Sequence, residues 1–252
     1  WMPLLVSGML VFMSCFQDKQ VHEKSASPEW ISIKGNSFVN ESGETVVFQG
    51  VNIRDPHKLE EEGHWTRSHF EEARAWGATV IRLPVHPPSW RTRCEEGYLA
   101  LIDQAVEWAR ELELYLILDW HSIGNLKMEL FQHEMYITSI EETTSFWNTV
   151  SKHYANEPVV IMYELFNEGA LAIKSVDTTR PVALANGDLL FLDLITELVP
   201  DIDIFGANVY RGVSFTDLYT RVQNEYGKPV LLTEFGADAF NARTNQEDQI
   251  CQ

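Results

Sequence analysis

The stretch Ala78-Thr-Val-Ile-Arg-Leu83 is short and almost continuously apolar, and Leu114-Tyr-Leu-Ile-Leu-Asp119 repeats this pattern further along the chain. Between the two stretches, apolar residues recur at helical spacing, at Leu101, Ile102, Ala105, Ala109 and Leu112. A strand, a helix and a second strand in this order form the unit of a parallel sheet, whose strands are apolar because both of their faces are buried. These residues therefore predict an α/β fold.

The same alternation extends over most of the chain. Further strand-like runs are Val46–Asn52, Val159–Phe166, Pro181–Leu184, Ile202–Ala207 and Pro229–Thr233, which brings the total to seven. Gly77 and Gly227 each stand between a helical segment and the next strand. Helices often end at a residue with positive φ, a conformation that glycine adopts without strain, so both glycines mark predicted helix ends. The chain is therefore expected to consist of repeated βα units.

Two architectures share this alternation, a doubly wound open sheet and a (β/α)8 barrel. The glycine-rich phosphate turn of dinucleotide-binding sheets is absent after the first predicted strand, which favours the barrel. However, Gly169–Arg180 leaves little room for a helix between the fourth and fifth strands, and no eighth strand is evident before Gln252. We therefore expect a (β/α)8 TIM barrel that is incomplete at the C-terminus.

The composition is that of one globular domain, since 45% of the 252 residues are hydrophobic and 22% are charged. With 37 acidic and 19 basic residues, the formal net charge of -18 disfavours nucleic acid and anionic membranes as partners, because phosphate groups would be repelled. A neutral substrate suits this charge better. The eight tryptophans favour a carbohydrate, because indole rings stack on sugar rings, although about half of them are expected to be core residues.

The first 28 residues have the pattern of a secretion leader followed by a tether. An apolar run from Pro3 to Ser14 is too short to span a membrane, and after Cys15 comes the polar segment Gln17–Ser27. We expect a bacterial protein that is secreted or held at the outer surface by a lipid anchor on Cys15, with its catalytic domain over residues 29–252. The cysteines do not have metal-ligand spacing.

Polar residues follow nearly every predicted strand, at the edge where the carboxyl ends of parallel strands meet. They are Asn52, Arg82, Asp119 with His121, Asn167 with Glu168, Asn208 with Tyr210, and Glu234. Barrel enzymes carry their chemistry at this edge, which forms the mouth of the barrel. The sequence therefore predicts one site built from these side chains.

Two of these residues, Glu168 and Glu234, follow the fourth and seventh strands and are expected to face each other across the mouth. Glycoside hydrolysis needs one carboxyl group that donates a proton to the leaving oxygen and a second that attacks the anomeric carbon. A separation of about 5–5.5 Å between the two groups leads to retention of configuration. One such glutamate alone would more simply be a solvated carboxylate, but the pair favours catalysis.

Several stretches resemble glycoside hydrolase family 5, which contains endoglucanases and mannanases. They are Phe48-Gln-Gly-Val-Asn52, Ile81-Arg-Leu-Pro-Val-His86, Leu116-Ile-Leu-Asp-Trp-His121, Tyr163-Glu-Leu-Phe-Asn-Glu168 and Lys228-Pro-Val-Leu-Leu-Thr-Glu-Phe-Gly236. Other stretches look more like the barrel domain of glycoside hydrolase family 2, namely Asp177-Thr-Thr-Arg-Pro181, Asn208-Val-Tyr-Arg211 and Thr233-Glu-Phe-Gly-Ala-Asp238. The resemblance changes near Gly169, so a chimeric gene is an open alternative.

The family 5 resemblance implies roles by position. Glu168 would be the acid/base, Glu234 the nucleophile, and Asn167 a ligand of the substrate's 2-hydroxyl group. The sequence departs from the family at Asn208-Val-Tyr210, where cellulases usually carry His-x-Tyr, and it lacks the tryptophan that follows the eighth strand.

Other residues of the predicted mouth also receive roles from the resemblance. Arg82 would keep Glu234 ionised by charge pairing, with a buried structural ion pair as the alternative. Tyr210 would donate a hydrogen bond to Glu234, and His121 would line the site. The predicted substrate-binding set also includes Asn52 and Asn208, together with His86 and Trp90, which we expect to stack on sugars. Trp90 is expected to lie in a proline-rich loop after the second strand, at the mouth of the barrel.

The leading hypothesis is a retaining β-glycosidase of the endo-β-1,4-glucanase type that acts on plant-wall polysaccharide by double displacement. An exo-acting enzyme of the family 2 kind, a mannan-active enzyme and an inactive carbohydrate-binding relative remain alternatives. We expect no cofactor, and no metal either, because the run Gln132-His-Glu-Met135 lacks a second histidine at helical spacing. We also expect a monomer whose partner is an oligo- or polysaccharide.

Overall fold

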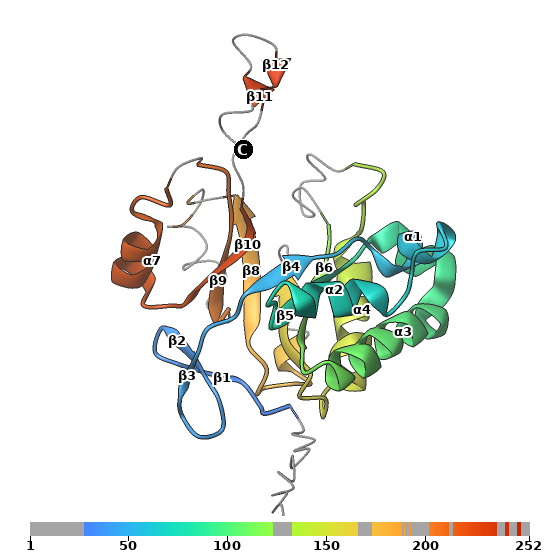
Figure 1. Ribbon diagram of the computed structural model, residues 1–252, viewed down its shortest axis with the longest axis horizontal. Coiled ribbons are helices and arrows are strands. Elements are labelled where there is room, and N and C mark those ends of the chain that lie inside the picture. The colour runs from blue at the N-terminus through green and yellow to red at the C-terminus, as the bar shows by residue number, and fades with distance from the viewer. Residues whose placement is uncertain are drawn as a thin grey trace, which may run out of the picture.

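The computed structural model describes residues 28–122, 133–165, 173–187, 189, 192, 202–211, 214–235, 240–241 and 246–247. Its centre is a parallel sheet of seven strands in the order β10-β9-β8-β7-β6-β5-β4 (Figure 1). The strands are β4 (Gly50–Asn52), β5 (Val80–Val85), β6 (Tyr115–Trp120), β7 (Val160–Leu165), β8 (Val182–Gly187), β9 (Ile204–Val209) and β10 (Val230–Phe235). Each strand lies beside its neighbour in sequence, as in a (β/α)8 barrel, so the predicted fold class is confirmed.

The predicted strands differ from the observed ones mainly at the beginning of the chain. Val46–Asn52, predicted as one strand, divides into β3 (Thr45–Val46) and β4. β3 forms a small antiparallel sheet with β1 (Ser32–Lys34) and β2 (Ser37–Val39). A β-carbon on Gly50 would stand 2.5 Å from the carbonyl oxygen of Val80, so the chain can enter the main sheet here only through a glycine.

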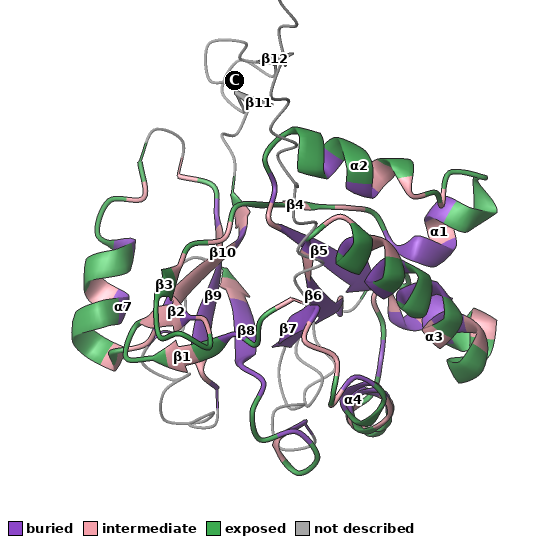
Figure 2. Cartoon of the chain, turned by 60° about the horizontal axis from the view of Figure 1, so that its bottom comes forward, coloured by how far each residue is buried: buried purple, intermediate pink, exposed green. Residues whose placement is uncertain are grey.

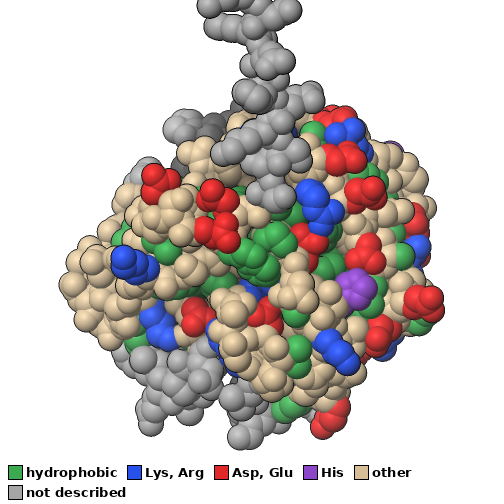
Figure 3. Space-filling view, turned by 90° about the horizontal axis from the view of Figure 1, so that it is seen from below, with side chains coloured by type: hydrophobic (Ala, Val, Ile, Leu, Met, Phe, Trp, Pro, Cys, Tyr) green, Lys and Arg blue, Asp and Glu red, His purple; other side chains and the backbone are tan. Residues whose placement is uncertain are grey.

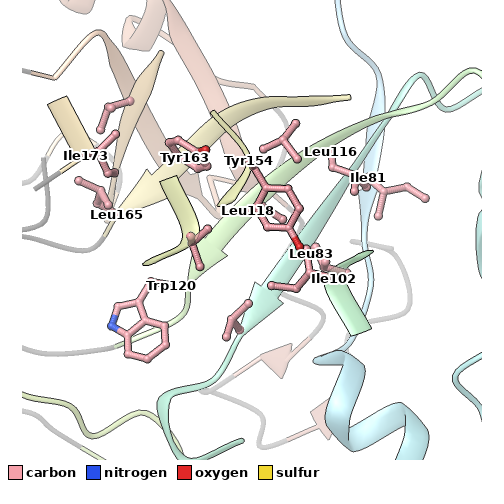
Figure 4. Packing of buried hydrophobic residues seen from close by; sticks show 14 of the residues in the cluster. Ile81, Leu83, Ile102, Leu116, Leu118, Trp120, Tyr154, Tyr163, Leu165 and Ile173 are labelled. Atoms are coloured by element: carbon pink, nitrogen blue, oxygen red, sulfur yellow. The ribbon is translucent and has the colours of Figure 1, made fainter. Parts of the chain in front are cut away.

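Helices cover the outer face of the main sheet. They are α1 (Pro56–Glu61), α2 (Ser68–Ala75), α3 (Pro87–Glu111), α4 (Ile140–His153) and α7 (Leu218–Tyr226). Outward-facing strand residues such as Leu83 and Leu118 pack with helix residues such as Ile102 to form the larger hydrophobic core (Figure 4). As predicted, Gly227 has positive φ and ends α7.

The inner face of the sheet forms a second, smaller core. Its buried residues include Val80, Ile117 and Met162, from three neighbouring strands. Phe38 and Val46 of the small antiparallel sheet pack against this cluster. The small sheet therefore covers the amino-terminal end of the barrel interior, and polar side chains can gather only toward the carboxyl ends of the strands.

Within the described residues the main sheet does not close, and β10 and β4 are its two edges. Val230, Leu231 and Leu232 of β10 are only partly buried, whereas β5 and β7 are buried throughout (Figure 2). The amide of Asn52 on β4 donates a hydrogen bond of 3.2 Å to the carbonyl oxygen of Thr233 on β10, so the two edges meet at their carboxyl ends.

The described residues contain no eighth parallel strand. The remaining strands, β11 (Phe240–Asn241) and β12 (Gln246–Glu247), form a separate antiparallel pair. Acidic side chains are spread over the face shown in Figure 3 and are not gathered in one patch. Within the described ranges, no helix has the length and apolar character needed to cross a membrane.

Candidate active site

Charged side chains lie on the inner face of three neighbouring strands, one layer above the apolar cluster. Arg82 lies two residues after Val80 on β5, Asp119 two residues after Ile117 on β6, and Glu164 two residues after Met162 on β7. Because strand side chains alternate between faces, each charged residue shares the inner face with its apolar neighbour. Asp119 and Glu164 are direct partners in the sheet register, so their carboxylates are adjacent.

The guanidinium group of Arg82 joins these carboxylates. Its Nε and Nη2 atoms donate to the two carboxylate oxygens of Glu164, at 2.7 and 2.6 Å, in a bidentate pair. Nη2 also lies 2.9 Å from Oδ2 of Asp119. The exposed fractions are 7% for Arg82, 2% for Asp119 and 0% for Glu164, so water hardly reaches these side chains. A buried charge is stable only beside a group of opposite charge, and here the guanidinium and the carboxylates stabilise one another.

Burial and mutual charge shift the pKa values of the cluster in opposite directions. Burial opposes the charge of Arg82, but Asp119 and Glu164 outweigh it and raise the arginine pKa. Burial, together with the charge of Asp119, raises the pKa of Glu164 to about 7 despite the attraction of Arg82. For Asp119, burial is outweighed by Arg82 and His121, and its pKa is lowered. The cluster can therefore hold a proton on Glu164 near neutral pH.

Asp119 also orients a histidine at the end of β6. Nδ1 of His121 lies 2.6 Å from Oδ2 of Asp119. Burial alone would lower the pKa of His121, but Asp119 raises it. The ring of His121 stacks on that of His86 at 5.3 Å, and Tyr136 lies edge-on to both rings. Burial lowers the pKa of His86, so the two stacked histidines differ in proton affinity.

Glu234 lies at the end of β10, just after an irregularity in the pairing of β10 with β9. Its side chain is 25% exposed, and its Oε1 lies 3.8 Å from Nη1 of Arg82. The hydroxyl of Tyr210 donates to Oε2 of Glu234 at 2.8 Å, and this bond, with burial, raises the pKa of Tyr210. The predicted contacts of Glu234 with Arg82 and Tyr210 are thus both present. The short contacts of Arg82, however, go to Glu164 and Asp119.

Asn208, which was predicted to bind substrate, lies beside Glu234 in the sheet register. It accepts a hydrogen bond from the hydroxyl of Thr233, the residue before Glu234. Because the Thr233 carbonyl in turn accepts from Asn52, the backbone that carries Glu234 is held from both sides. Asn52, Asn208 and Tyr210 therefore converge on the same strand end.

A hollow of about 720 Å³ opens between β10, β4 and the small antiparallel sheet, and both Arg82 and Glu234 line it. A larger hollow of about 960 Å³ lies between α3 and α4, lined by residues such as Leu99 and Asn148. No residue of the charged cluster lines the larger hollow, so the smaller hollow is the candidate binding site. Among the described residues, no group of three or more His, Cys, Asp or Glu side chains is arranged to hold a metal.

Two of the predicted site residues, Asn167 and Glu168, lie outside the described residues, so the structure gives no distance between Glu168 and Glu234. The placement of Trp90 in a loop at the mouth is wrong. Trp90 lies in α3 and is 8% exposed, because its ring packs against those of Phe146 and Tyr98. Core packing, not sugar stacking, accounts for this tryptophan.

Sequence reasoning missed two acidic residues. Glu164 stands inside an otherwise apolar strand, and this was the available signal, because a charge buried in a parallel sheet needs a partner. Asp55 is 0% exposed and accepts hydrogen bonds from the backbone of Lys58 and His86 and from the hydroxyl of Tyr98. It fixes the backbone of His86, and no sequence pattern indicated that contact.

A curled parallel sheet with carboxylates, an arginine and histidines at the carboxyl ends of its strands defines a barrel protein with an enzyme-like mouth. Residues 39–185, more than half of the chain, match the model of the family described as Cellulase (glycosyl hydrolase family 5). The chain belongs to this family.

Known relatives agree with this assignment. Endoglucanase A of Butyrivibrio fibrisolvens is 26% identical over 145 residues, which cover 55% of this chain and 31% of the relative. Endoglucanase C of Acetivibrio thermocellus is 24% identical over 178 residues, which cover 60% of this chain and 52% of the relative. The chain thus spans only about a third to a half of the length of these two relatives.

Among solved structures, the β-glucanase SdGluc5_26A from Saccharophagus degradans is similar, with a TM-score of 0.70 and 34% identity. The match covers 82% of this chain and 73% of that one. SdGluc5_26A has also been solved in complex with cellotetraose.

Proposed function

We propose that this protein hydrolyses β-1,4-linked glucan within the chain and with retention of configuration, using Glu234 as nucleophile and Glu168 as acid/base. In the first step, Glu168 donates its proton to the leaving glycosidic oxygen while Glu234 attacks the anomeric carbon and forms a glycosyl ester. In the second step, Glu168 takes a proton from water, the water oxygen attacks the anomeric carbon, and Glu234 leaves as a carboxylate.

The observation that carries this proposal is the environment of Glu234. A nucleophilic carboxylate must be ionised, held in one orientation and open to substrate. Glu234 lies 3.8 Å from the Arg82 cation, accepts a hydrogen bond from Tyr210 and keeps 25% of its side chain exposed beside a hollow. The endoglucanase names of the relatives, and the cellotetraose bound to SdGluc5_26A, support a β-glucan as the substrate.

The proposal is tested by Glu234→Gln, which keeps the shape of the side chain and removes the attacking oxygen anion. We expect hydrolysis of carboxymethyl cellulose to fall at least about a thousandfold, since the covalent step is lost. The matched control is Glu225→Gln on the exposed face of α7, where the carboxylate contacts only Arg221 in the described structure and activity should be unchanged. Retained activity in purified, folded Glu234→Gln would contradict the proposal.

An exo-acting enzyme of the family 2 kind is the second candidate. The family 2-like stretches after Gly169 support it, and among these Asn208 and Tyr210 are neighbours of Glu234. An exo-acting enzyme would cleave small aryl-glycosides much faster than polymer, and an endo-acting one would lower the viscosity of polymer before releasing small sugars. The same assay with mannan in place of glucan tests the mannan-active alternative, which predicts faster hydrolysis of mannan.

A carbohydrate-binding protein without turnover is a candidate from another class. It would bind cello-oligosaccharide in calorimetry, and Glu234→Gln would leave the affinity unchanged. The unmodified chain would then release no reducing sugar on long incubation with any of these polymers.

Export is part of the same proposal. Of the predicted leader and tether, residues 1–27 lie outside the described residues. Fatty-acid labelling of the protein in a bacterial host should disappear in Cys15→Ser if Cys15 carries a lipid anchor. Labelling that persists in the variant would place the lipid elsewhere, and export without labelling would favour secretion.

A further inference from the structure

The guanidinium of Arg82 is held from one side only. Nε and Nη2 form the edge that Glu164 occupies at 2.7 and 2.6 Å, and Asp119 adds a contact to Nη2 at 2.9 Å. The remaining nitrogen, Nη1, has Glu234 as its carboxylate partner at 3.8 Å. A bidentate contact fixes both the position and the plane of a guanidinium, because two parallel bonds must be satisfied at once. The orientation of Nη1 toward Glu234 is therefore set by Glu164.

Glu164 has no direct route to substrate. Its side chain is fully buried, whereas that of Glu234 is 25% exposed. The groups that face Glu164 are Asp119 on β6, Arg82 on β5 and His121 at the end of β6. Any effect of Glu164 on a bound sugar must consequently pass through Arg82 or through the histidine that Asp119 holds.

We propose that Glu164 is a positioning residue for the nucleophile, which acts through Arg82 by holding the guanidinium so that Nη1 faces Glu234. This inference rests on the proposed function of Glu234 for its effect on rate, but not for its effect on the Arg82–Glu234 contact. Loss of the bidentate pair frees the guanidinium to rotate toward Asp119. Glu234 then loses its cationic partner, and its ionised form becomes less favourable.

Glu164 can influence Glu234 in two ways, which have opposite effects on the Arg82–Glu234 contact. If Glu164 only competed with Glu234 for the cation, its replacement by glutamine would leave Arg82 free to approach Glu234, and the separation of 3.8 Å would shorten. If Glu164 holds Arg82 in place, the same substitution lets the guanidinium turn away, and the separation lengthens. The direction in which Arg82 moves therefore separates positioning from simple charge compensation.

The experiment compares crystal structures of the unmodified chain and of Glu164→Gln. We expect Nη1 of Arg82 to move away from Oε1 of Glu234 in Glu164→Gln, beyond the range of about 4 Å that defines an ion pair. An unchanged or shorter separation overturns the inference, whether or not the protein hydrolyses glucan. Asp177→Asn, which alters the other buried arginine–carboxylate pair in the described structure, should leave the Arg82–Glu234 separation unchanged.

Kinetics provide the second readout and separate this inference from the proposed function. With an active protein, we expect Glu164→Gln to lower kcat about tenfold or more with little change in KM, and to move the acidic limb of the pH profile upward. If Glu164→Gln fails to fold, Arg82→Lys keeps the positive charge without the bidentate contact and should likewise lower kcat with little change in KM. Combining both substitutions should add little to the loss in Arg82→Lys alone, and additive effects would overturn the inference.

Discussion

Arg82 lies on β5, and Arg180 lies two residues before β8, at the amino-terminal end of the barrel. Both arginines are buried, but their surroundings differ in kind. Around Arg180, Nε donates to the carbonyl oxygen of Val160 at 2.6 Å and Nη2 to that of Glu157 at 2.8 Å. Its Nη1 contacts Asp177 and the hydroxyl of Tyr163. Each nitrogen of Arg180 is thus bonded within the fold, with one carboxylate to balance one cation.

Around Arg82 the balance is different. Three carboxylates surround one guanidinium, namely Asp119, Glu164 and Glu234. One of these, Glu234, stands at a distance and faces a hollow that solvent can enter. A structural arginine has all of its donors satisfied, whereas Arg82 keeps one nitrogen directed at a partly exposed carboxylate. This difference indicates that Arg180 stabilises the fold and that Arg82 serves the site.

Substitution of each arginine by lysine tests this division directly, and the largest effect on kcat is expected at Arg82. Arg82→Lys should lower kcat about a hundredfold or more, which corresponds to about 2.7 kcal/mol, because lysine cannot contact Glu164 in bidentate fashion and still face Glu234. Arg180→Lys should lower the melting temperature but leave kcat of the folded protein within about twofold. Steady-state kinetics on folded samples measure both. Equal losses of kcat would remove the distinction between the two arginines.

Asp177→Asn should change stability alone. Asp177 accepts from the backbone of Thr179 and Arg180 as well as from the Arg180 side chain, so the substitution leaves a buried cation without its counter-charge. We expect a loss of about 2–4 kcal/mol in the free energy of unfolding by urea. Asp217→Asn, at an exposed position before α7, is the control and should cost less than about 1 kcal/mol. Reduced activity per folded molecule in Asp177→Asn would show that the Arg180 end also serves the site.

The stability of the unmodified chain should depend on pH through Glu164. The pKa of Glu164 is raised from 4.5 to about 7 by folding, so its contribution is fully present below about pH 4.5 and is lost as the pH rises through 7. Glu164→Gln stays neutral and lacks this dependence. Relative to this variant, the unmodified chain should lose about 1–3 kcal/mol between pH 5 and pH 8, measured by urea unfolding at each pH. Parallel stability curves for the two proteins would contradict a proton held on Glu164.

Tyr210→Phe should produce the smallest effect. It removes one hydrogen bond to Glu234 from a tyrosine that is itself 57% exposed, so water can replace part of the contact. We expect kcat/KM to fall about three- to tenfold, in keeping with the loss of one hydrogen bond to a charged group at a partly solvated position. A loss as large as that of Arg82→Lys would mean that Tyr210, not Arg82, is the main partner of Glu234.

The fold could be predicted from the sequence because each strand is a local pattern. Runs such as Leu114–Asp119 are apolar on both faces, and residues such as Gly227 mark the ends of helices. Polar residues at the ends of these runs, among them Tyr210 and Glu234, could be assigned to one site because parallel strands end at the same edge.

The features that could not be predicted from the sequence depend on contacts between residues that are distant along the chain. Glu164 was hidden inside a strand, and its pairing with Arg82 follows from the sheet register, which sequence periodicity does not give. Trp90 was misplaced because a segment rich in proline suggested a loop. Pro87 and Pro88 instead occupy the first turn of α3, where a backbone N–H would have no acceptor within the helix, so proline is tolerated. The ring of Trp90 then turns inward to neighbours that only tertiary packing brings together.

The most direct test of the proposed chemistry is to trap the glycosyl-enzyme with an activated 2-deoxy-2-fluoro-β-cellobioside and to measure the intact mass of the protein. We predict an increase by one fluorocellobiosyl group, located by peptide mapping on Glu234 and absent from Glu234→Gln. Hydrolysis of glucan by a protein that acquires no label, or a label on a carboxylate other than Glu234, would contradict the assignment of Glu234 as nucleophile.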